Sequence, residues 1–141
     1  MRKVALIVAL VVMATFVGSV CYSEDIFIEE VKTLDIAARD YEDAVPVTTF
    51  EALEPVMFFV KYTIVGNENR RYRVSVIAEA WGDKVRTKER GLPPGTYFTL
   101  NSKLVPDDVD ADTYTVNYKV KLKKGGTVWT DEDSSEVTIT P

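Results

Sequence analysis

The segment formed by residues 106–123 constrains the fold of this chain more than any other part of the sequence. An acidic stretch that ends at Asp112 is followed by strict alternation of two sets of side chains. One set comprises Tyr114, Val116, Tyr118, Val120 and Leu122, and the other comprises Thr115, Asn117, Lys119, Lys121 and Lys123. A repeat of two residues places each set on its own face of a β-strand, one dry and one wet. The segment therefore predicts an antiparallel sheet with one buried face.

The same alternation recurs along the chain and predicts an all-β fold. Residues 55–65 and 72–81 flank the turn-forming sequence at residues 66–69, which predicts a hairpin of two long strands. Further strands are predicted at residues 26–33, 45–50, 85–88, 96–104 and 113–123, and a last one at 127–140 with an interruption at 131–134. The pattern is typical of an antiparallel two-sheet sandwich of about seven strands.

The first 23 residues have the pattern of a secretory signal peptide. Arg2 and Lys3 precede an uncharged apolar run at residues 4–17, and Cys21 and Ser23 stand at the −3 and −1 positions of a cut before Glu24. The apolar run is shorter than the roughly 20 residues that a membrane-spanning helix needs. We therefore expect an exported protein, located in the periplasm, at the cell surface or in the medium.

Cys21 allows a second interpretation of the same segment. The sequence before it resembles the signal of a lipoprotein, but Val20 stands where that signal has a small residue. Lipidation would attach the protein to a membrane, whereas cleavage before Glu24 removes the only cysteine of the chain. In the second case no disulfide bond stabilises the mature protein.

The charge of the chain is acidic and unevenly distributed. The formal net charge is −5, and removal of the signal leaves 15 basic and 22 acidic residues, 15 − 22 = −7, which argues against nucleic acid as a partner. Residues 24–54 contain ten acids and two bases, whereas residues 61–90 contain eight bases and four acids. Either both surfaces are simply solvated, or the acidic segment lies along the basic middle of the same or a neighbouring molecule. The predicted organisation is a signal at 1–23, an acidic segment with one or two edge strands at 24–54, and a sandwich at 55–141.

Residues 110–116, with the sequence DADTYTV, resemble the corner between strands E and F in immunoglobulin-like and fibronectin type III-like domains. In those domains a tyrosine at the start of strand F turns its hydroxyl back to the upstream backbone, a role that falls on Tyr114. Residues 92–97 are similar to the Pro/Gly turn that opens a strand in such modules, and the resemblance covers residues 55–141. It implies an immunoglobulin-like sandwich. The chain departs from the family in lacking the disulfide, and Trp81 falls on the polar face of its strand.

The residue types argue against an enzyme. The chain has no histidine, which excludes the usual serine and cysteine triads and any imidazole metal site. Its carboxylates cluster in loops and on polar strand faces, where they stay solvated. No organic cofactor is predicted.

Asp108, Asp110 and Asp112 have the alternate spacing of acids in calcium-binding loops. The EF-hand pattern fails because Thr113 stands where its glycine is required and Lys119 where its last glutamate is required. Two interpretations remain at this stage: a looser calcium site, joined by Asp131 or Asp133, and a solvated corner loop.

Trp81 and Trp129 are candidates for contact with a partner, because an exposed indole stacks on sugars or anchors proteins. The alternative for Trp81 is cover by residues 24–50 of its own chain. The leading functional hypothesis is a non-enzymatic interaction or structural module that binds protein, itself or another, through sheet edges or an exposed aromatic face. The alternatives are a fibre subunit, in which residues 26–31 pair with the next subunit, and a calcium- or carbohydrate-binding module.

Overall fold

The computed structural model describes residues 23–141 of the chain. Residues 1–22 of the predicted signal peptide, including Cys21 and its lipidation, lie outside the described residues, and the structure does not test the predicted cut before Glu24. Within residues 23–141, no helix is long and apolar enough to cross a membrane.

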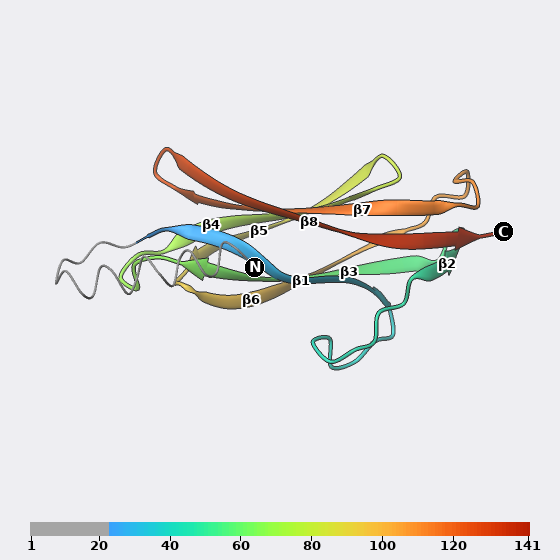
Figure 1. Ribbon diagram of the computed structural model, residues 1–141, viewed down its shortest axis with the longest axis horizontal. Coiled ribbons are helices and arrows are strands. Elements are labelled where there is room, and N and C mark those ends of the chain that lie inside the picture. The colour runs from blue at the N-terminus through green and yellow to red at the C-terminus, as the bar shows by residue number, and fades with distance from the viewer. Residues whose placement is uncertain (1–22) are drawn as a thin grey trace.

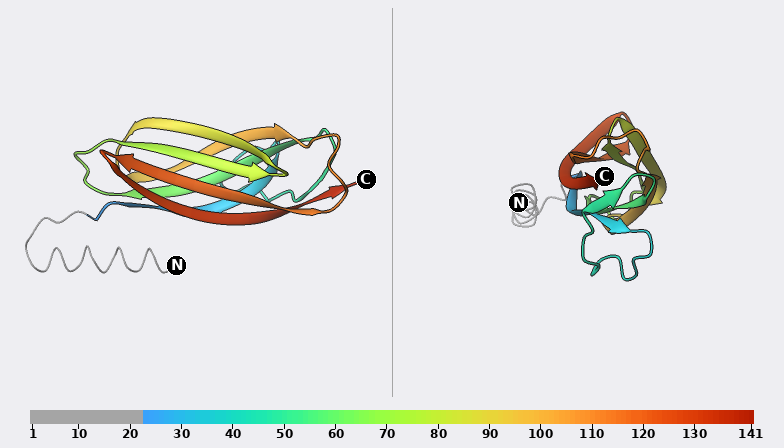
Figure 2. Two further views of the ribbon diagram at one scale, coloured as in Figure 1. Left: turned by 90° about the horizontal axis from the view of Figure 1, so that it is seen from above. Right: turned by 90° about the vertical axis from the view of Figure 1, so that its right-hand side faces the viewer.

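Within residues 23–141, eight strands form two sheets that face each other (Figure 1). They are β1 (Asp25–Asp35), β2 (Thr49–Glu51), β3 (Pro55–Val65), β4 (Tyr72–Ala80), β5 (Asp83–Leu92), β6 (Gly95–Leu104), β7 (Thr113–Lys124) and β8 (Thr127–Thr140). The first sheet, sheet A, has the order β1-β3-β6, and the second, sheet B, has the order β2-β8-β7-β4-β5. The long strands run nearly along the long axis of the molecule (Figure 2). The prediction of an all-β, sandwich-like fold is confirmed.

The prediction of purely antiparallel sheets is wrong in one place. The short strand β2 pairs in parallel with the end of β8, with Thr49 opposite Thr138 and Glu51 opposite Thr140. Between β1 and β2 the chain crosses from sheet A to sheet B, and β2 then runs in the same direction as β8. Sheet B also curls, and the other strand pairs of both sheets are antiparallel.

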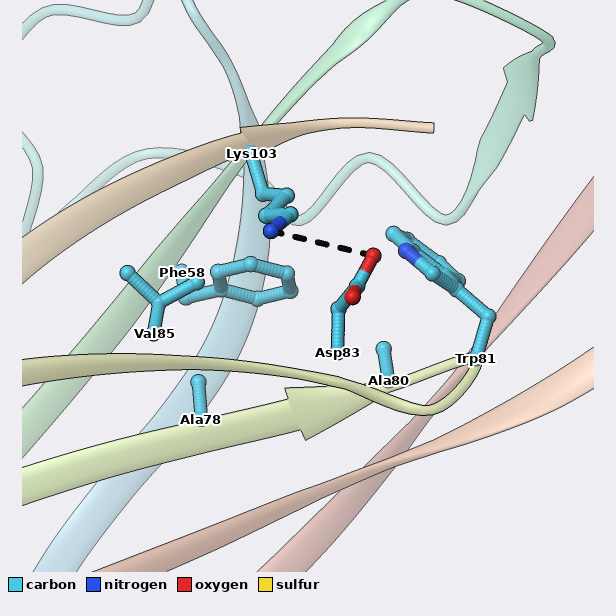
Figure 3. A pocket seen from close by; sticks show the side chains of 7 residues that line it. All are labelled: Phe58, Ala78, Ala80, Trp81, Asp83, Val85 and Lys103. Atoms are coloured by element: carbon cyan, nitrogen blue, oxygen red, sulfur yellow. Dashed lines mark ion pairs between the residues drawn. The ribbon is translucent and has the colours of Figure 1, made fainter. Parts of the chain in front are cut away.

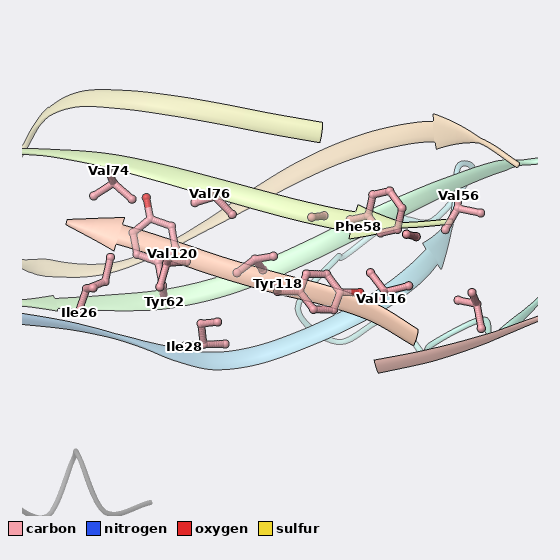
Figure 4. Packing of buried hydrophobic residues seen from close by; sticks show 14 of the residues in the cluster. Ile26, Ile28, Val56, Phe58, Tyr62, Val74, Val76, Val116, Tyr118 and Val120 are labelled. Atoms are coloured by element: carbon pink, nitrogen blue, oxygen red, sulfur yellow. The ribbon is translucent and has the colours of Figure 1, made fainter. Parts of the chain in front are cut away.

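The core lies between the two sheets and is built from the alternate positions that the sequence indicated (Figure 4). In β7 the side chains of Val116, Tyr118, Val120 and Leu122 are buried, and those of the intervening residues face outward. From sheet A, Phe58 packs edge-on against Tyr118 with ring centroids 6.4 Å apart. The pattern of residues 113–123 therefore identified the buried face of the central strand of sheet B.

Two strands are longer than the sequence suggested. The charged strand β5 extends over ten residues, beyond the predicted residues 85–88, because it pairs with nearly all of β4. The strand β8 continues through residues 131–134, where the sequence predicted an interruption. Its acidic residues stay in the ladder because β7 is long enough to pair with them, and Asp131 Oδ2 also accepts a hydrogen bond of 2.8 Å from the N–H of Ile28 in β1.

The acidic N-terminal segment adds one edge strand to each sheet. β1 pairs with β3 from Asp25 opposite Val65 to Asp35 opposite Val56, with a bulge near Ile28. Ion pairs also join this segment to the basic middle of the same molecule, from Glu24 to Arg70 at 3.3 Å and from Glu42 to Lys61 at 3.7 Å. In this structure residues 26–31 therefore lie in their own sheet.

Candidate functional site: the open edge between β5 and β6

The acidic corner before β7 is organised by Tyr114. Its hydroxyl donates a hydrogen bond of 2.6 Å to the backbone carbonyl of Asp110, four residues upstream. The carbonyl of Asp112 accepts a bond of 2.8 Å from the N–H of Ile139, and its side chain accepts one from the N–H of Thr113. Desolvation raises the pKa of Tyr114, and the charges of Asp110 and Asp112 raise it further. The backbone of this loop is thus held to the end of sheet B.

The carboxylates of the corner are exposed and are not gathered around a common point. In the part of the chain that the structure describes, no group of three or more His, Cys, Asp or Glu side chains is close enough to hold a metal ion. Asp131, which the sequence offered as a further ligand, binds the N–H groups of Ile28 and Glu132. A calcium site at Asp108, Asp110 and Asp112 therefore remains a prediction from spacing alone.

The two tryptophans are half-buried and pack against the core. Trp81 and Gly82 form the two-residue turn between β4 and β5, with φ angles of 41° and 80°. Glycine or asparagine usually occupies such positions, so Trp81 is an unusual choice. Its ring meets Tyr114 edge-on, with centroids 6.4 Å apart, and its buried Nε1 has no hydrogen-bond partner among the described residues. Contact of either tryptophan with a partner stays a prediction.

A narrow crevice opens beside Trp81, where the ends of β4, β5 and β6 meet (Figure 3). It is lined by Phe58, Ala78, Ala80, Trp81, Asp83, Val85 and Lys103, and it is too narrow to admit a water molecule. Across it, Lys103 of sheet A forms an ion pair with Asp83 of sheet B at 3.7 Å. Because small-molecule sites are wide, largely apolar cavities, this crevice does not have the form of one.

The crevice marks the end of an open side of the molecule. On the opposite side, β1 and β8 are joined by the bond from Ile28 to Asp131. Here β5 pairs with β4 and β6 pairs with β3, and the described structure shows no hydrogen-bonded ladder between β5 and β6. Each of these ten-residue strands thus has one side without a strand partner among the described residues. Such edges are templates for another strand unless they are protected.

The two edges differ in their protection. β5 carries four exposed basic side chains, Lys84, Arg86, Lys88 and Arg90, and charges of this kind oppose edge-to-edge pairing. In β6 the only charged residue is Lys103, and the side chains of Phe98 and Leu104 are 43% and 55% exposed. The β6 edge is therefore the less protected of the two.

An apolar surface adjoins the β6 edge on the outer face of sheet A. Phe59 in β3 is fully buried there although it points away from the core, because residues 36–48 fold over it. We call this loop the strap, and it stands out below sheet A in Figure 1. Phe98 of β6 lies at the rim of the strap. Its ring is stacked on that of Phe59, with centroids 5.5 Å apart, and is tilted against that of Tyr41 in the strap, with centroids 6.2 Å apart.

Lys32 of β1 holds the strap in place. Its side chain is 4% exposed, and its Nζ donates to the carbonyls of Glu42 at 2.9 Å and Ala44 at 3.0 Å. The ammonium group lies 4.8 Å from the centre of the Phe59 ring, a cation–π contact, and 3.6 Å from Glu30. The strap thus covers the part of the outer face of sheet A around Phe59, whereas Glu30 of β1 and Lys61 of β3 stay partly exposed.

Comparison with protein-family models and with curated protein sequences finds no match for this chain.

Sequence reasoning missed Lys32 and Phe98. Lys32 falls on the polar positions of a weakly alternating strand, where a lysine normally indicates solvent. A signal was nevertheless present, because Phe58 and Phe59 are adjacent and a strand cannot bury both on one face. One of the two rings therefore had to lie on the outer face of its sheet and be covered by another segment. The nearest long loop is the strap.

Proposed function

We propose that this protein is an exported, non-enzymatic interaction module with an immunoglobulin-like fold that binds an extended segment of another protein along the β6 edge. The observation that carries the proposal is the contrast between the charged β5 edge and the weakly charged β6 edge with its exposed Phe98 and Leu104. Strand addition supplies main-chain hydrogen bonds, and the alternate side chains of the added strand supply specificity.

The strand order supports the immunoglobulin-like assignment. In that fold strands A, B and E share one sheet, and strands C, F and G share the other. The order β1-β3-β6 matches A-B-E, and the order β4-β7-β8 matches C-F-G. β7 then takes the place of strand F, and the bond from Tyr114 to Asp110 has the form of the tyrosine corner.

The β6 edge offers a partner both hydrogen-bonding groups and apolar contacts. A strand added to β6 places every second side chain on the outer face of sheet A, beside Phe98 and Leu100. Phe98 already stacks on the buried Phe59, so it is held in position before binding. An extended segment with apolar side chains at alternate positions is the partner chemistry that fits this edge.

The test selects short random peptides against residues 24–141 and maps the bound peptide by hydrogen exchange. Added protection is expected at the amides of β6 and not at those of β5. The double variant Ser102→Lys, Leu104→Lys places charges on the β6 edge and is expected to weaken binding at least about tenfold. The matched control, Thr115→Lys with Asn117→Lys, adds the same charge on the outer face of β7 and should bind normally.

Protection that falls on β5, on β1 or on the corner before β7 would contradict the proposal. Equal binding by the two double variants would contradict it as well, because the added charges would then have no effect at the proposed edge.

A further inference from the structure

The outer face of sheet B gathers seven of the 15 basic residues that the structure describes in this acidic protein. Strand pairing aligns the outward-facing positions of β5, β4 and β7, so that Ile77 lies between Arg86 and Lys119, and Ser75 lies between Lys88 and Lys121. Seven side chains of this face are basic, namely Arg73, Lys84, Arg86, Lys88, Lys119, Lys121 and Lys123, and Glu79 is the acidic one among them. We call this surface the basic face.

The basic side chains crowd one another. Desolvation lowers the pKa of Lys121, and the neighbouring charges of Lys119, Arg86, Lys123 and Lys84 lower it further. Ile77 and Ser75 are each only 8% exposed although they point outward, and their neighbours across the ladder are the long basic side chains. The aliphatic stems therefore cover the middle of the sheet, and the ammonium and guanidinium groups stand at its surface.

The acidic segment of the same chain does not neutralise this face. Its described ion pairs, from Glu24 to Arg70, from Glu42 to Lys61 and from Glu30 to Lys32, all involve bases outside the seven. On the face itself Glu79 pairs with Lys84 at 3.5 Å, and Glu132 of β8 pairs with Lys119 at 3.4 Å. Seven bases against these two acids leave the face with a net positive charge.

We propose that the basic face is a second interaction surface, which binds an acidic, extended segment of a partner protein lying along β7. The proposal is independent of strand addition at β6, because β7 is the central strand of the other sheet.

The spacing of the charges favours an extended polypeptide. Lys119, Lys121 and Lys123 repeat every two residues along one strand, which is about 6.7 Å. An extended chain repeats its side chains on one side with the same period, so a segment with an acid at every second position faces each lysine in turn. Arg73 and Lys88 flank this row on the neighbouring strands and widen the field.

The chemistry of the face argues against other anionic partners. No aromatic side chain is among its outward-facing residues in β4, β5 and β7, so nothing on it stacks on a sugar ring or a nucleobase. Ile77 is covered, and Val128 of β8, which is 51% exposed opposite Lys123, offers a lipid surface only one small apolar side chain beside the face. Most of the bases are lysines, which recognise charge rather than the bidentate geometry of phosphate.

The test measures binding of two synthetic peptides to residues 24–141 by titration calorimetry at low salt. One peptide alternates glutamate and threonine, and the other has the same composition with all glutamates in one block. The alternating peptide is expected to bind more tightly, and added salt should weaken its binding. The variant Lys119→Gln, Lys121→Gln, Lys123→Gln should lose about tenfold in affinity.

The matched control is Arg39→Gln, Lys61→Gln, Arg70→Gln, which removes three charges outside the basic face and the β6 edge and should bind normally. Circular dichroism of both triple variants checks that each is folded. The proposal is overturned if neither peptide binds, if both bind equally, or if the control variant loses as much affinity. It is also overturned if heparin or vesicles of phosphatidylcholine and phosphatidylglycerol bind this face more tightly than the alternating peptide does, or if the protein alone self-associates through it.

Discussion

Two tyrosines, one at each end of the molecule, close loops in the same way. Tyr97 donates 2.7 Å to the carbonyl of Pro93, and Tyr114 donates 2.6 Å to that of Asp110, each four residues upstream. Tyr97→Phe and Tyr114→Phe keep the ring and remove the bond. Tyr97→Phe should lower the free energy of unfolding by about 1 kcal/mol, and Tyr114→Phe should lower it by less, because its bond is exposed to solvent. Urea unfolding measures the change, with Tyr41→Phe in the strap as the control, expected within about 0.5 kcal/mol of the parent. A loss at Tyr114 without one at Tyr97 would show that only the second loop depends on its hydroxyl.

A buried phenol should make the stability depend on alkaline pH. Burial raises the pKa of Tyr118 from 10.0 to about 12, with a smaller upward effect of Asp133 and an opposing effect of the bond to Ser135. The folded protein keeps this proton to higher pH than the unfolded chain does. The stabilisation is therefore complete below pH 10 and is lost as the pH rises from 10 to 12, and a two-unit shift corresponds to roughly 3 kcal/mol.

Tyr118→Phe removes the titrating group, so its free energy of unfolding should fall less between pH 10 and 12 than that of the parent. Ser135→Ala keeps the phenol and removes the hydrogen bond that opposes the rise in its pKa, so it should show a pH dependence at least as large as that of the parent. Denaturant unfolding at a series of alkaline pH values distinguishes the two. Equal slopes for the parent and Tyr118→Phe would assign the alkaline loss to other groups, such as Tyr62, whose pKa is also raised by burial.

At the residue scale, local sequence predicted some roles and left out others. Tyr114 was predictable because an acidic loop and a strict alternation meet at it. Lys32 and the left-handed backbone of Trp81 were not, because each depends on packing between segments far apart in the chain. From sequence alone, a lysine in a strand predicts a solvent-exposed side chain. Only the folded structure shows that carbonyls of the strap accept hydrogen bonds from Lys32.

At the scale of elements, the strap is attached to sheet A chiefly through Lys32. Lys32→Met retains an unbranched apolar stem but loses both bonds to the strap carbonyls, so we expect a loss of about 2 kcal/mol in unfolding free energy. The freed strap should be cut faster by trypsin at Arg39, which limited digestion and mass spectrometry detect. Lys61→Met is the control, because its ion pair with Glu42 is long and partly exposed and should contribute little. Unchanged cleavage in Lys32→Met would show that Tyr41 and its apolar contacts suffice to hold the strap.

Elements whose pattern is local were predicted well, and those defined by their partners were not. β3, β4 and β7 each alternate over nine or more residues, and each lies where the sequence placed it. The parallel pairing of β2 and the continuity of β8 follow from where their neighbours lie. The acidic run at residues 131–133 predicted a loop, and only the length of β7 and the N–H of Ile28 keep it in a strand.

At the scale of the whole molecule, the acidic segment is as much a part of the fold as the rest of the chain. The buried side chains of Ile26, Leu34 and Phe50 all belong to residues 24–54. Without residues 24–54, residues 55–141 would expose the edge of β3 that pairs with β1 and the ring of Phe59 that the strap covers. We therefore expect this fragment to be unfolded or aggregated, although the sequence placed a domain boundary at residue 55.

Adding residues 24–54 as a separate peptide should restore the folded state, because β1 makes its contacts through an antiparallel ladder that needs no covalent link to β3. Circular dichroism and the dispersion of amide proton signals follow the recovery, and a peptide with Ile26→Asp and Leu34→Asp is the control that should fail. A fragment 55–141 that folds alone as a stable monomer would contradict this expectation.

The ladder between β1 and β3 also bears on the fibre hypothesis. Since β1 occupies its own sheet, the intact chain should elute as a monomer in size-exclusion chromatography. A polymer that disappears on deletion of residues 24–44 would instead show that β1 is exchanged between subunits.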